Sequence, residues 1–265
     1  MKYLRAAAIG LFVAAIGLFV VSKVQVNMKT DPSRPVITCD ADEIEVSVEY
    51  TEEQLREGVH AEDAEDGDLT DEIIVGDISQ FIDTGVSYVS YVVFDSANQP
   101  AVCSRKVRFI DYESPKFGLT APLVFRAGDI NNAMNLIVAR DVLDGDITSS
   151  VLNTNDDISY QIPGTYTIEI EVTNSYGDMQ NAALPVHVVD SHINLLENNN
   201  PLVYIECGEP LDASALTKGL FVSEMENATP QEVTVESNVD VKTPGIYEVH
   251  FSCAQGETWT TVIVR

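Results

Sequence analysis

A ten-residue motif occurs twice in this chain, and its spacing predicts how the chain divides. AEDAEDGDLT covers residues 61–70, and ARDVLDGDIT covers residues 139–148 with Ala, three Asp, Gly and Thr in register. Each copy is followed by a second shared stretch, DTGVSYVSYVVFDS at 83–96 and IPGTYTIEIEVTNS at 162–175. A third copy of this later stretch, TPGIYEVHFSC, lies at 243–253. Such self-similarity predicts three tandem units of about eighty residues each.

The later stretch of each copy has the pattern of a half-buried strand. A turn glycine opens it, and apolar residues then alternate with polar ones, as Ile168 and Ile170 alternate with Glu169 and Glu171. A period of two is typical of a strand with one face packed against a core. We therefore predict an all-β chain of sandwich domains, in which only residues 51–57 and 130–135 form brief helical turns. The three turn glycines are Gly85, Gly164 and Gly245.

The repeats and the short acidic linkers after them set the domain boundaries. We predict domain 1 at 35–111, domain 2 at 112–190 and domain 3 at 191–265, with a linker at 23–34. Prolines near the start of each unit favour a rigid, extended entry. Because few residues separate the units, we expect a rod of three sandwiches.

The first 22 residues have a different composition from the rest. An uncharged apolar run, AAAIGLFVAAIGLFVV at 6–21, follows Lys2 and Arg5. Its length suits either a membrane span or a signal-peptide core, and no obvious cleavage motif follows it. We favour an uncleaved signal anchor that forms an N-terminal hydrophobic helix. We therefore expect a single-pass protein of the cell membrane with extracellular C-terminal domains, or a secreted protein if residues 1–22 are cleaved.

The charge of the chain is strongly negative. It has 15 Lys and Arg against 42 Asp and Glu, which gives a formal net charge of −27. Such a surface repels polyanions, which argues against nucleic acid and bare anionic membrane as partners. We expect an extracellular protein or glycan as partner, and membrane contact only through residues 6–21.

Four cysteines follow the apolar run, and none of them has C-x-x-C spacing. An even number of cysteines behind an export signal predicts disulfides rather than a zinc site. Sequence alone allows three pairings, but the domain division places two cysteines in the first unit and two in the third. We therefore predict disulfides between Cys39 and Cys103, and between Cys207 and Cys253.

The motif and the strand after it resemble the Ig-like domains of bacterial surface proteins. The shared pattern is Ala-x-Asp-x-x-Asp-Gly-Asp-Leu/Ile-Thr, followed by x-Gly-x-Tyr-x-Ile/Val and an Asp/Asn-Ser turn. It is similar to the type found in insecticidal crystal toxins and in cadherin-like or HYR-like repeats. The likeness covers residues 33–190, and the third unit keeps only its later half. The resemblance implies three tandem immunoglobulin-like β-sandwich domains that act as adhesive or spacing modules, not as an enzyme.

The three aspartates of each motif allow two interpretations. A tight turn needs Gly67 or Gly145 at positive φ, with short acidic side chains that bind their own backbone. Alternatively, the aspartates and the linker carboxylates supply the hard oxygen ligands that calcium prefers, and the ion stiffens the hinge between units. The spacing is not that of an EF-hand, so we favour the turn and keep calcium as the alternative. The candidate ligands are Asp141, Asp144, Asp146, Asp111, Glu113, Asp63, Asp66 and Asp68.

No residues have the spacing of a catalytic centre. The histidines at 60, 187, 192 and 250 are scattered, and none forms a triad pattern with a Ser or Cys nucleophile. We therefore predict a non-enzymatic protein.

One strand has an unusual outward face. After Gly85 the outward positions include Tyr88, Val92 and Phe94, where the second unit has Thr and Glu. Exposed apolar residues on an acidic protein are a candidate contact face, and burial against a neighbouring element is the alternative. Trp259, the only tryptophan, is either a core residue or a platform for a ligand. We predict a cell-surface adhesion or spacer module, or alternatively a receptor-type domain that binds a carbohydrate or protein.

Overall fold

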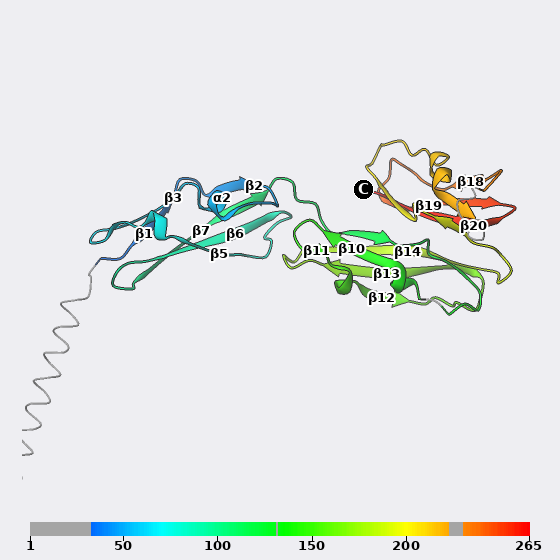
Figure 1. Ribbon diagram of the computed structural model, residues 1–265, viewed down its shortest axis with the longest axis horizontal. Helices are drawn as coiled ribbons and strands as arrows, with labels where there is room; N and C mark the ends of the chain where they lie inside the picture. Colours follow the sequence, from blue (N-terminus) through cyan, green and yellow to red (C-terminus); the bar gives the residue numbers. More distant parts are fainter. Residues whose placement is uncertain (1–32, 131, 223–229) are drawn as a thin grey trace, which may run out of the picture. The chain divides into compact units, whose positions relative to one another are not determined.

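The computed structural model describes residues 33–130, 132–222 and 230–265 (Figure 1). The predicted anchor at 1–22 and nearly all of the predicted linker at 23–34 lie outside these residues. In the described part of the chain no helix is long and apolar enough to cross a membrane. The predicted fold class is confirmed there, because almost all regular structure is β-strand. The described residues divide into two compact units, the first ending at Tyr112 and the second covering Glu113–Arg265.

The first unit is a sandwich of a three-stranded and a four-stranded sheet. The smaller sheet has the strand order β1-β3-β4, and the larger has β2-β7-β6-β5. The chain changes sheets between β1 and β2, and β2 pairs parallel with β7 while the other pairs are antiparallel. Tyr91, Val93 and Val107 are fully buried in its core. The strands are β1 (Val36–Cys39), β2 (Glu43–Val46), β3 (Val59–Asp63), β4 (Gly67–Asp68), β5 (Ile74–Ile78), β6 (Val86–Phe94) and β7 (Pro100–Phe109).

The second unit begins with a sandwich of the same topology. Its sheets have the orders β11-β10-β8 and β12-β13-β14-β9, and β9 pairs parallel with β14. The inward positions of the predicted strand, Ile168, Ile170 and Val172, are buried in its core as the alternation predicts. The strands are β8 (Lys116–Leu119), β9 (Val124–Arg126), β10 (Ile137–Asp141), β11 (Gly145–Asp146), β12 (Leu152–Asp156), β13 (Gly164–Thr173) and β14 (Met179–Val189).

The remaining strands of the second unit form a third pair of sheets. Their orders are β15-β17 and β16-β20-β19-β18, again with one parallel pair, β16 with β20. Val249, Phe251 and Val262 are fully buried between them. The strands are β15 (Leu196–Asn198), β16 (Leu202–Ile205), β17 (Leu220–Val222), β18 (Thr234–Ser237), β19 (Gly245–Cys253) and β20 (Gly256–Val264).

The repeated glycine and tyrosine form a small corner in the second and third sandwiches. The Tyr166 hydroxyl donates to the Ile162 carbonyl at 2.9 Å, and Tyr247 repeats this bond to Thr243 at 2.9 Å. The ring of each tyrosine lies over the glycine two residues earlier. A Cβ atom added at Gly245 would lie only 3.3 Å from the Tyr247 ring. The tyrosine therefore fixes the entry of the strand. In the first sandwich Ser87 replaces the tyrosine and donates to the Ser79 carbonyl.

Helical turns occur in both predicted segments, but the prediction that there are only two is wrong, because 3-10 turns also form at η1 (Thr70–Glu72), η3 (Thr148–Ser150) and η4 (Ala215–Gly219). The helix α2 (Glu52–Arg56) begins at Thr51, which forms a capping box with Gln54. The reciprocal bonds satisfy two backbone N–H groups that a helix start leaves free. Within 130–135, a 3-10 turn, η2 (Ala133–Leu136), begins after Asn132, whose side chain accepts from the Met134 N–H.

The third sandwich packs beside the second, so the prediction of an end-to-end rod is wrong for this pair. The Tyr204 hydroxyl donates to the Phe117 carbonyl at 3.1 Å, and Arg265 lies 3.8 Å from Glu113. The last residue of the chain thus contacts the first residue of the unit. A rod would separate these residues by the length of two sandwiches. The alternation that predicts each strand carries no information about how sandwiches pack against one another.

The predicted disulfide between Cys207 and Cys253 is also wrong. Cys207 lies at the C-terminal end of β20, where its N–H donates to the Arg265 carbonyl at 2.8 Å. Cys253 pairs with Gly256 at the opposite end of the same strand. Eight strand residues separate these ends by roughly 26 Å, whereas a disulfide requires Cα atoms within about 7 Å. Sharing a domain does not bring two cysteines together, and both are free thiols.

Candidate functional site

The first copy of the acidic motif is a turn in which each aspartate accepts hydrogen bonds. The Asp63 carboxylate accepts from the N–H groups of Glu65 and Asp66 at 2.8 and 3.1 Å. Gly67 has a φ of 79°, in the left-handed region that favours glycine. Asp68 then accepts from the Thr70 N–H at 2.9 Å. The turn links β3 to β4 and presents Leu69 to the core.

The second copy repeats these bonds one by one. Asp141 accepts from the N–H groups of Leu143 and Asp144, and Asp146 accepts from the Thr148 N–H. Gly145 has a φ of 74°. In both copies the threonine hydroxyl bonds the backbone of the alanine, at Thr70–Ala61 and Thr148–Ala139. Both alanines are fully buried, so a larger side chain would not fit. Every repeated position of the motif therefore has a structural role.

The middle aspartate of each motif connects the two sheets of its sandwich. Asp66 accepts from the Ser96 N–H at 2.7 Å, in the turn between β6 and β7. Asp144 accepts from the Ser175 N–H and hydroxyl at 2.6 and 2.7 Å, in the turn between β13 and β14. This bond explains why the acidic motif and the Asp/Asn-Ser turn occur together in the repeat. One turn holds the other in place across the sandwich.

The remaining candidate calcium ligands also have partners. Asp111 accepts from the Ser47 hydroxyl at 2.7 Å and from the Val48 N–H at 2.8 Å. Glu113 forms ion pairs with Lys116 and Arg265. Among the residues that the structure describes, no group of three or more His, Cys, Asp or Glu side chains is placed to hold a metal ion. The hydrogen bonds favour the turn interpretation of the motif.

The hydrogen bonds also shift the acidity of these carboxyl groups. The pKa of Asp63 is lowered, mainly because the Glu65 N–H donates to its carboxylate. Hydrogen bonds from Thr70 and Thr148 lower the pKa values of Asp68 and Asp146 in the same way. A donor that binds the charged form favours ionisation. The turns are therefore most stable with their aspartates charged.

The predicted contact face lies on the outer side of the larger sheet in the first unit. Tyr88 and Phe94 are each 39% exposed, and Val92 is half-buried. Burial by a neighbouring element, the alternative interpretation, is therefore wrong for Tyr88 and Phe94. Val92 lies between Ile74 of β5 and Val102 of β7, its direct partners in the sheet.

Ile74 and Val102 extend this face beyond the residues that the sequence predicts. They are 53% and 70% exposed. We call the set Ile74, Tyr88, Val92, Phe94 and Val102 the β5-β6-β7 face. Val102 occupies an outward position in a run that alternates, so strand alternation in 100–109 was the available signal for it; β5 does not alternate, because its register shifts between Val75 and Ile78. The position of Ile74 and Val102 beside Val92 depends on the strand register, which cannot be read from the sequence.

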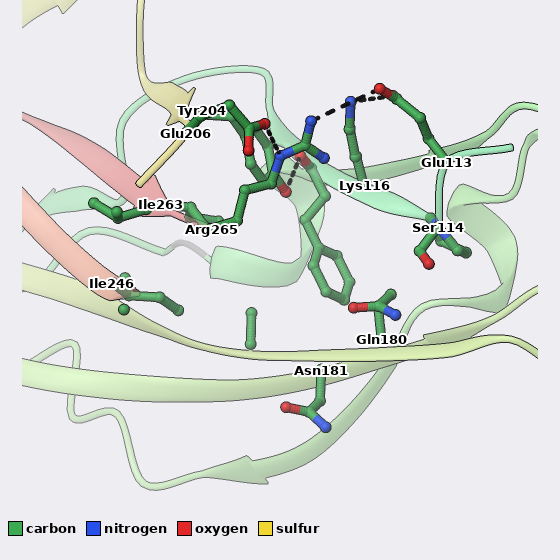
Figure 2. Close-up of a pocket in the computed structure, with 15 residues that line it drawn as sticks. Glu113, Ser114, Lys116, Gln180, Asn181, Tyr204, Glu206, Ile246, Ile263 and Arg265 are labelled. Carbon is green, nitrogen blue, oxygen red and sulfur yellow. Dashed lines mark hydrogen bonds and ion pairs between the residues drawn. The ribbon is translucent and has the colours of Figure 1, made fainter. Parts of the chain in front are cut away.

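The second unit contains a cleft between its two sandwiches (Figure 2). Its volume is about 460 Å³. One side carries Glu113, Lys116 and Arg265, and Gln180 points toward them from β14, whereas the side chain of Asn181 points away (Figure 2). The charges on the first side are paired, because Lys116 binds Glu113, and Arg265 binds Glu206 at 2.7 Å. The cleft therefore offers one side-chain amide and paired charges rather than a net charge.

Tyr204 forms the aromatic part of this cleft. The Arg265 guanidinium lies 5.7 Å from the centre of its ring, and its hydroxyl bonds Phe117. Burial raises the pKa of Tyr204, so the phenol stays neutral over the physiological range. The adjacent carboxyl of Glu113 has a lowered pKa because Lys116 donates to it. Hydrogen bonds and ion pairs thus fix the positions of Tyr204, Glu113 and Arg265.

Trp259 lies neither in the core nor on a free platform. Its indole stacks on His187 of the second sandwich at 4.2 Å and on His250 at 4.3 Å, with the rings nearly parallel. Two rings cannot both lie this close on one side, so the indole lies between them. His187 also contacts Glu248 at 2.5 Å, and His250 contacts Glu257 at 3.1 Å. These residues join the two sandwiches, a role that the scattered histidines of the sequence do not reveal.

These features define a tandem β-sandwich protein in which aspartates connect the two sheets within the first and second sandwiches, and His187 and Trp259 join the second sandwich to the third. No family model matches the chain. The pesticidal crystal protein Cry22Aa of Bacillus thuringiensis is 29% identical over 201 residues, which are 73% of this chain and 27% of that protein. The chain therefore spans about a quarter of the length of this relative. The sequence likeness agrees with the crystal-toxin resemblance, while membership of that family stays a prediction.

Two solved structures align with the chain at low scores. The structure of CBM51-2 in complex with GlcNAc and INT domains from Clostridium perfringens ZmpB has a TM-score of 0.24 and 15% identity. The alignment covers 63% of the present chain and 28% of the ZmpB chain. The protocadherin gammaB4 extracellular domain has a TM-score of 0.20 and 12% identity, over 88% of this chain and 49% of that chain. Scores this low say nothing further about fold or function.

Proposed function

We propose that the chain is an exported, non-enzymatic adhesion module, tethered to the cell membrane through residues 6–21. The β5-β6-β7 face is the surface by which it contacts an extracellular protein. The observation that carries the proposal is the cross-strand row Ile74, Val92 and Val102, with the exposed ring of Phe94 next to Val92 and that of Tyr88 farther along β6, beyond Ser90. Contiguous exposed apolar side chains of this kind mark interaction sites.

The repeat itself supports a binding role for this face rather than a spacing role. The equivalent strand of the second sandwich, β13, has Thr167, Glu171 and Thr173 where β6 has Tyr88, Val92 and Phe94. The same fold therefore does not require apolar residues at these positions. A passive spacer has no reason to expose them in one copy only, because exposed apolar area promotes association.

The test is to give β6 the outward residues of β13. The variant Tyr88→Thr, Val92→Glu, Phe94→Thr should keep its fold, because β13 already carries these residues. We expect it to lose adhesion by at least about tenfold, since interface aromatic residues often carry more than 1.4 kcal/mol each. The measurement is attachment of beads coated with the full chain to cells of the producing strain, with circular dichroism to verify folding.

The control alters the polar residues at equivalent positions of the second sandwich. Thr167→Ser with Glu171→Gln alters β13 at two of the equivalent positions and should leave attachment unchanged. Equal attachment by the β6 variant and the native chain would reject the proposal and favour a spacer. The N-terminal tether is tested separately, by protease treatment of intact cells, which should degrade an exported chain.

The cleft in the second unit favours a second candidate, a receptor that binds a carbohydrate. Gln180 and Glu206 offer an amide and a carboxylate beside Tyr204, and such groups suit hydroxyl-rich ligands. A glycan array with the full chain tests this candidate. Binding that Gln180→Ala abolishes and Asn181→Ala preserves would support it, whereas binding that survives Gln180→Ala would reject the cleft as the site.

A further inference from the structure

Two thiols of the first sandwich lie in contact although 64 residues separate them in sequence. The sulfur atoms of Cys39 and Cys103 are 3.4 Å apart. Cys39 ends β1 in the smaller sheet, and Cys103 lies in β7 of the larger sheet, opposite the buried Tyr91. Both thiols are free and partly exposed. The pair therefore bridges the two sheets without a covalent bond.

We propose that Cys39 and Cys103 are a redox modification site that closes to a disulfide between the two sheets. The sulfurs need to approach by little more than 1 Å, because a disulfide bond is about 2.05 Å long. Side-chain rotation supplies such a movement without a change in strand pairing. Cys207 and Cys253 lie at opposite ends of a strand and have no such partner in each other.

The oxidation requires an acceptor for two electrons, and a small-molecule disulfide such as oxidised glutathione supplies it. One thiol loses its proton and attacks this disulfide, which releases one glutathione and leaves a mixed disulfide. The second thiol then loses its proton and displaces the second glutathione. Burial and the Cys103 thiol raise the pKa of Cys39 to about 11. We therefore expect closure to become faster as the pH rises, because the thiolate is the attacking form.

The position of the bond gives it a mechanical consequence, which rests on the proposed tether. β1 is the first described strand after the apolar segment, and it is held in its sheet by four residue pairs with β3. Tension on a tethered chain would reach this strand first. A Cys39–Cys103 bond transfers the tension directly to β7, which ends shortly before Tyr112. The residues between the two cysteines are then outside the load-bearing path.

The chemical test uses the full chain in mild detergent, equilibrated with oxidised glutathione and then alkylated. We expect the tryptic peptide that ends at Arg56 to be joined to the one that ends at Arg105, with a loss of two hydrogen atoms. Cys207 and Cys253 should be alkylated in the same sample, which provides an internal control. Alkylation of Cys39 and Cys103, or glutathione bound to each, would overturn the proposal.

Thermal unfolding provides a second measurement. Oxidised native chain should melt about 10 °C or more above the reduced chain, because the bond closes a long loop in a small domain. Cys39→Ser with Cys103→Ser should melt at the same temperature under both conditions. Cys207→Ser with Cys253→Ser should keep the difference. Equal melting temperatures for the oxidised and the reduced native chain would contradict the proposal of a structural disulfide.

Single-molecule extension tests the consequence for force. When the full chain is pulled at its two ends, the first sandwich should extend by roughly 230 Å less when oxidised, since 64 residues at about 3.6 Å each stay locked. Reduction should restore the full length. An unchanged length in oxidised chain would overturn the proposal, whereas loss of adhesion with a normal length change would concern only the proposed function.

Discussion

At the scale of single residues, all three carboxylates of the acidic motif accept hydrogen bonds that hold the turn in place. Asp63 and Asp141 bind their own backbone, Asp66 and Asp144 bind the facing hairpin, and the third aspartate holds the threonine. The sequence could predict the turn from Gly67 and Gly145. It could not predict the bond from Asp144 to Ser175, because that contact depends on how the two sheets face each other.

Replacement of the buried Asp141 should therefore destabilise the second sandwich. Asp141→Ala leaves the N–H groups of Leu143 and Asp144 and the Asn174 amide without this acceptor. We expect a loss of about 1–3 kcal/mol in the free energy of unfolding, measured by denaturant titration. Glu169→Ala, an exposed change on β13, serves as the control. The loss should be equal in calcium and in chelator; a loss seen only in calcium would indicate an ion at the motif.

Acid should destabilise the first sandwich through the same carboxyl groups. Hydrogen bonds lower the pKa values of Asp63 and Asp68 in the folded state. Their contribution is therefore fully present above the ordinary Asp pKa of about 3.9 and is lost as the pH falls through the lower folded values. The melting temperature should fall between pH 5 and pH 2, and Asp63→Asn should reduce this fall. A pH profile identical in the variant would contradict this explanation.

At the scale of elements, the strands follow from alternation and turns, while their pairing does not. The sequence predicted β13 and β19 from Gly164 and Gly245, and both strands begin at these residues. It gave no indication of the parallel pairs, such as β9 with β14, because these join residues far apart in the chain. The prediction of a rod was wrong for the second and third sandwiches for a similar reason. The outward faces of strands in two sandwiches can pack against each other, and strand alternation does not reveal this contact.

Trp259 is the residue on which this packing between sandwiches depends most. Trp259→Ala removes its stacking contacts with His187 and His250. We expect the second unit to lose about 2–4 kcal/mol and to unfold in two steps instead of one, because the sandwiches then separate. Calorimetry measures both effects. His60→Ala, in the first unit, is the control, and a single transition in the tryptophan variant would argue against this role.

At the scale of the whole molecule, the formal net charge of −27 is the dominant property. Many like charges on a folded chain repel each other, and salt screens this repulsion. Increasing sodium chloride from 10 to 150 mM shortens the screening length from about 30 to about 8 Å. We therefore expect the melting temperature to rise by several degrees. Sucrose at equal osmolarity is the control, and a fall in melting temperature with salt would show that ion pairs such as Arg265–Glu206 dominate instead.

The sequence by itself determined the all-β class, the position of the central strands and the turn chemistry of the motif. These follow from local rules: a period of two for a half-buried strand, and glycine where φ is positive. It also selected Tyr88, Val92 and Phe94, because the second repeat shows what such positions carry when they face water.

Only the tertiary structure decided which distant residues meet. It brought Cys39 to Cys103 but separated Cys207 from Cys253, although the same argument from domains predicted both pairs. It also placed His187 against Trp259 and completed the β5-β6-β7 face with Ile74 and Val102. Register, sheet facing and domain packing are set by the sum of many weak contacts across the fold, and no short stretch of sequence contains that sum.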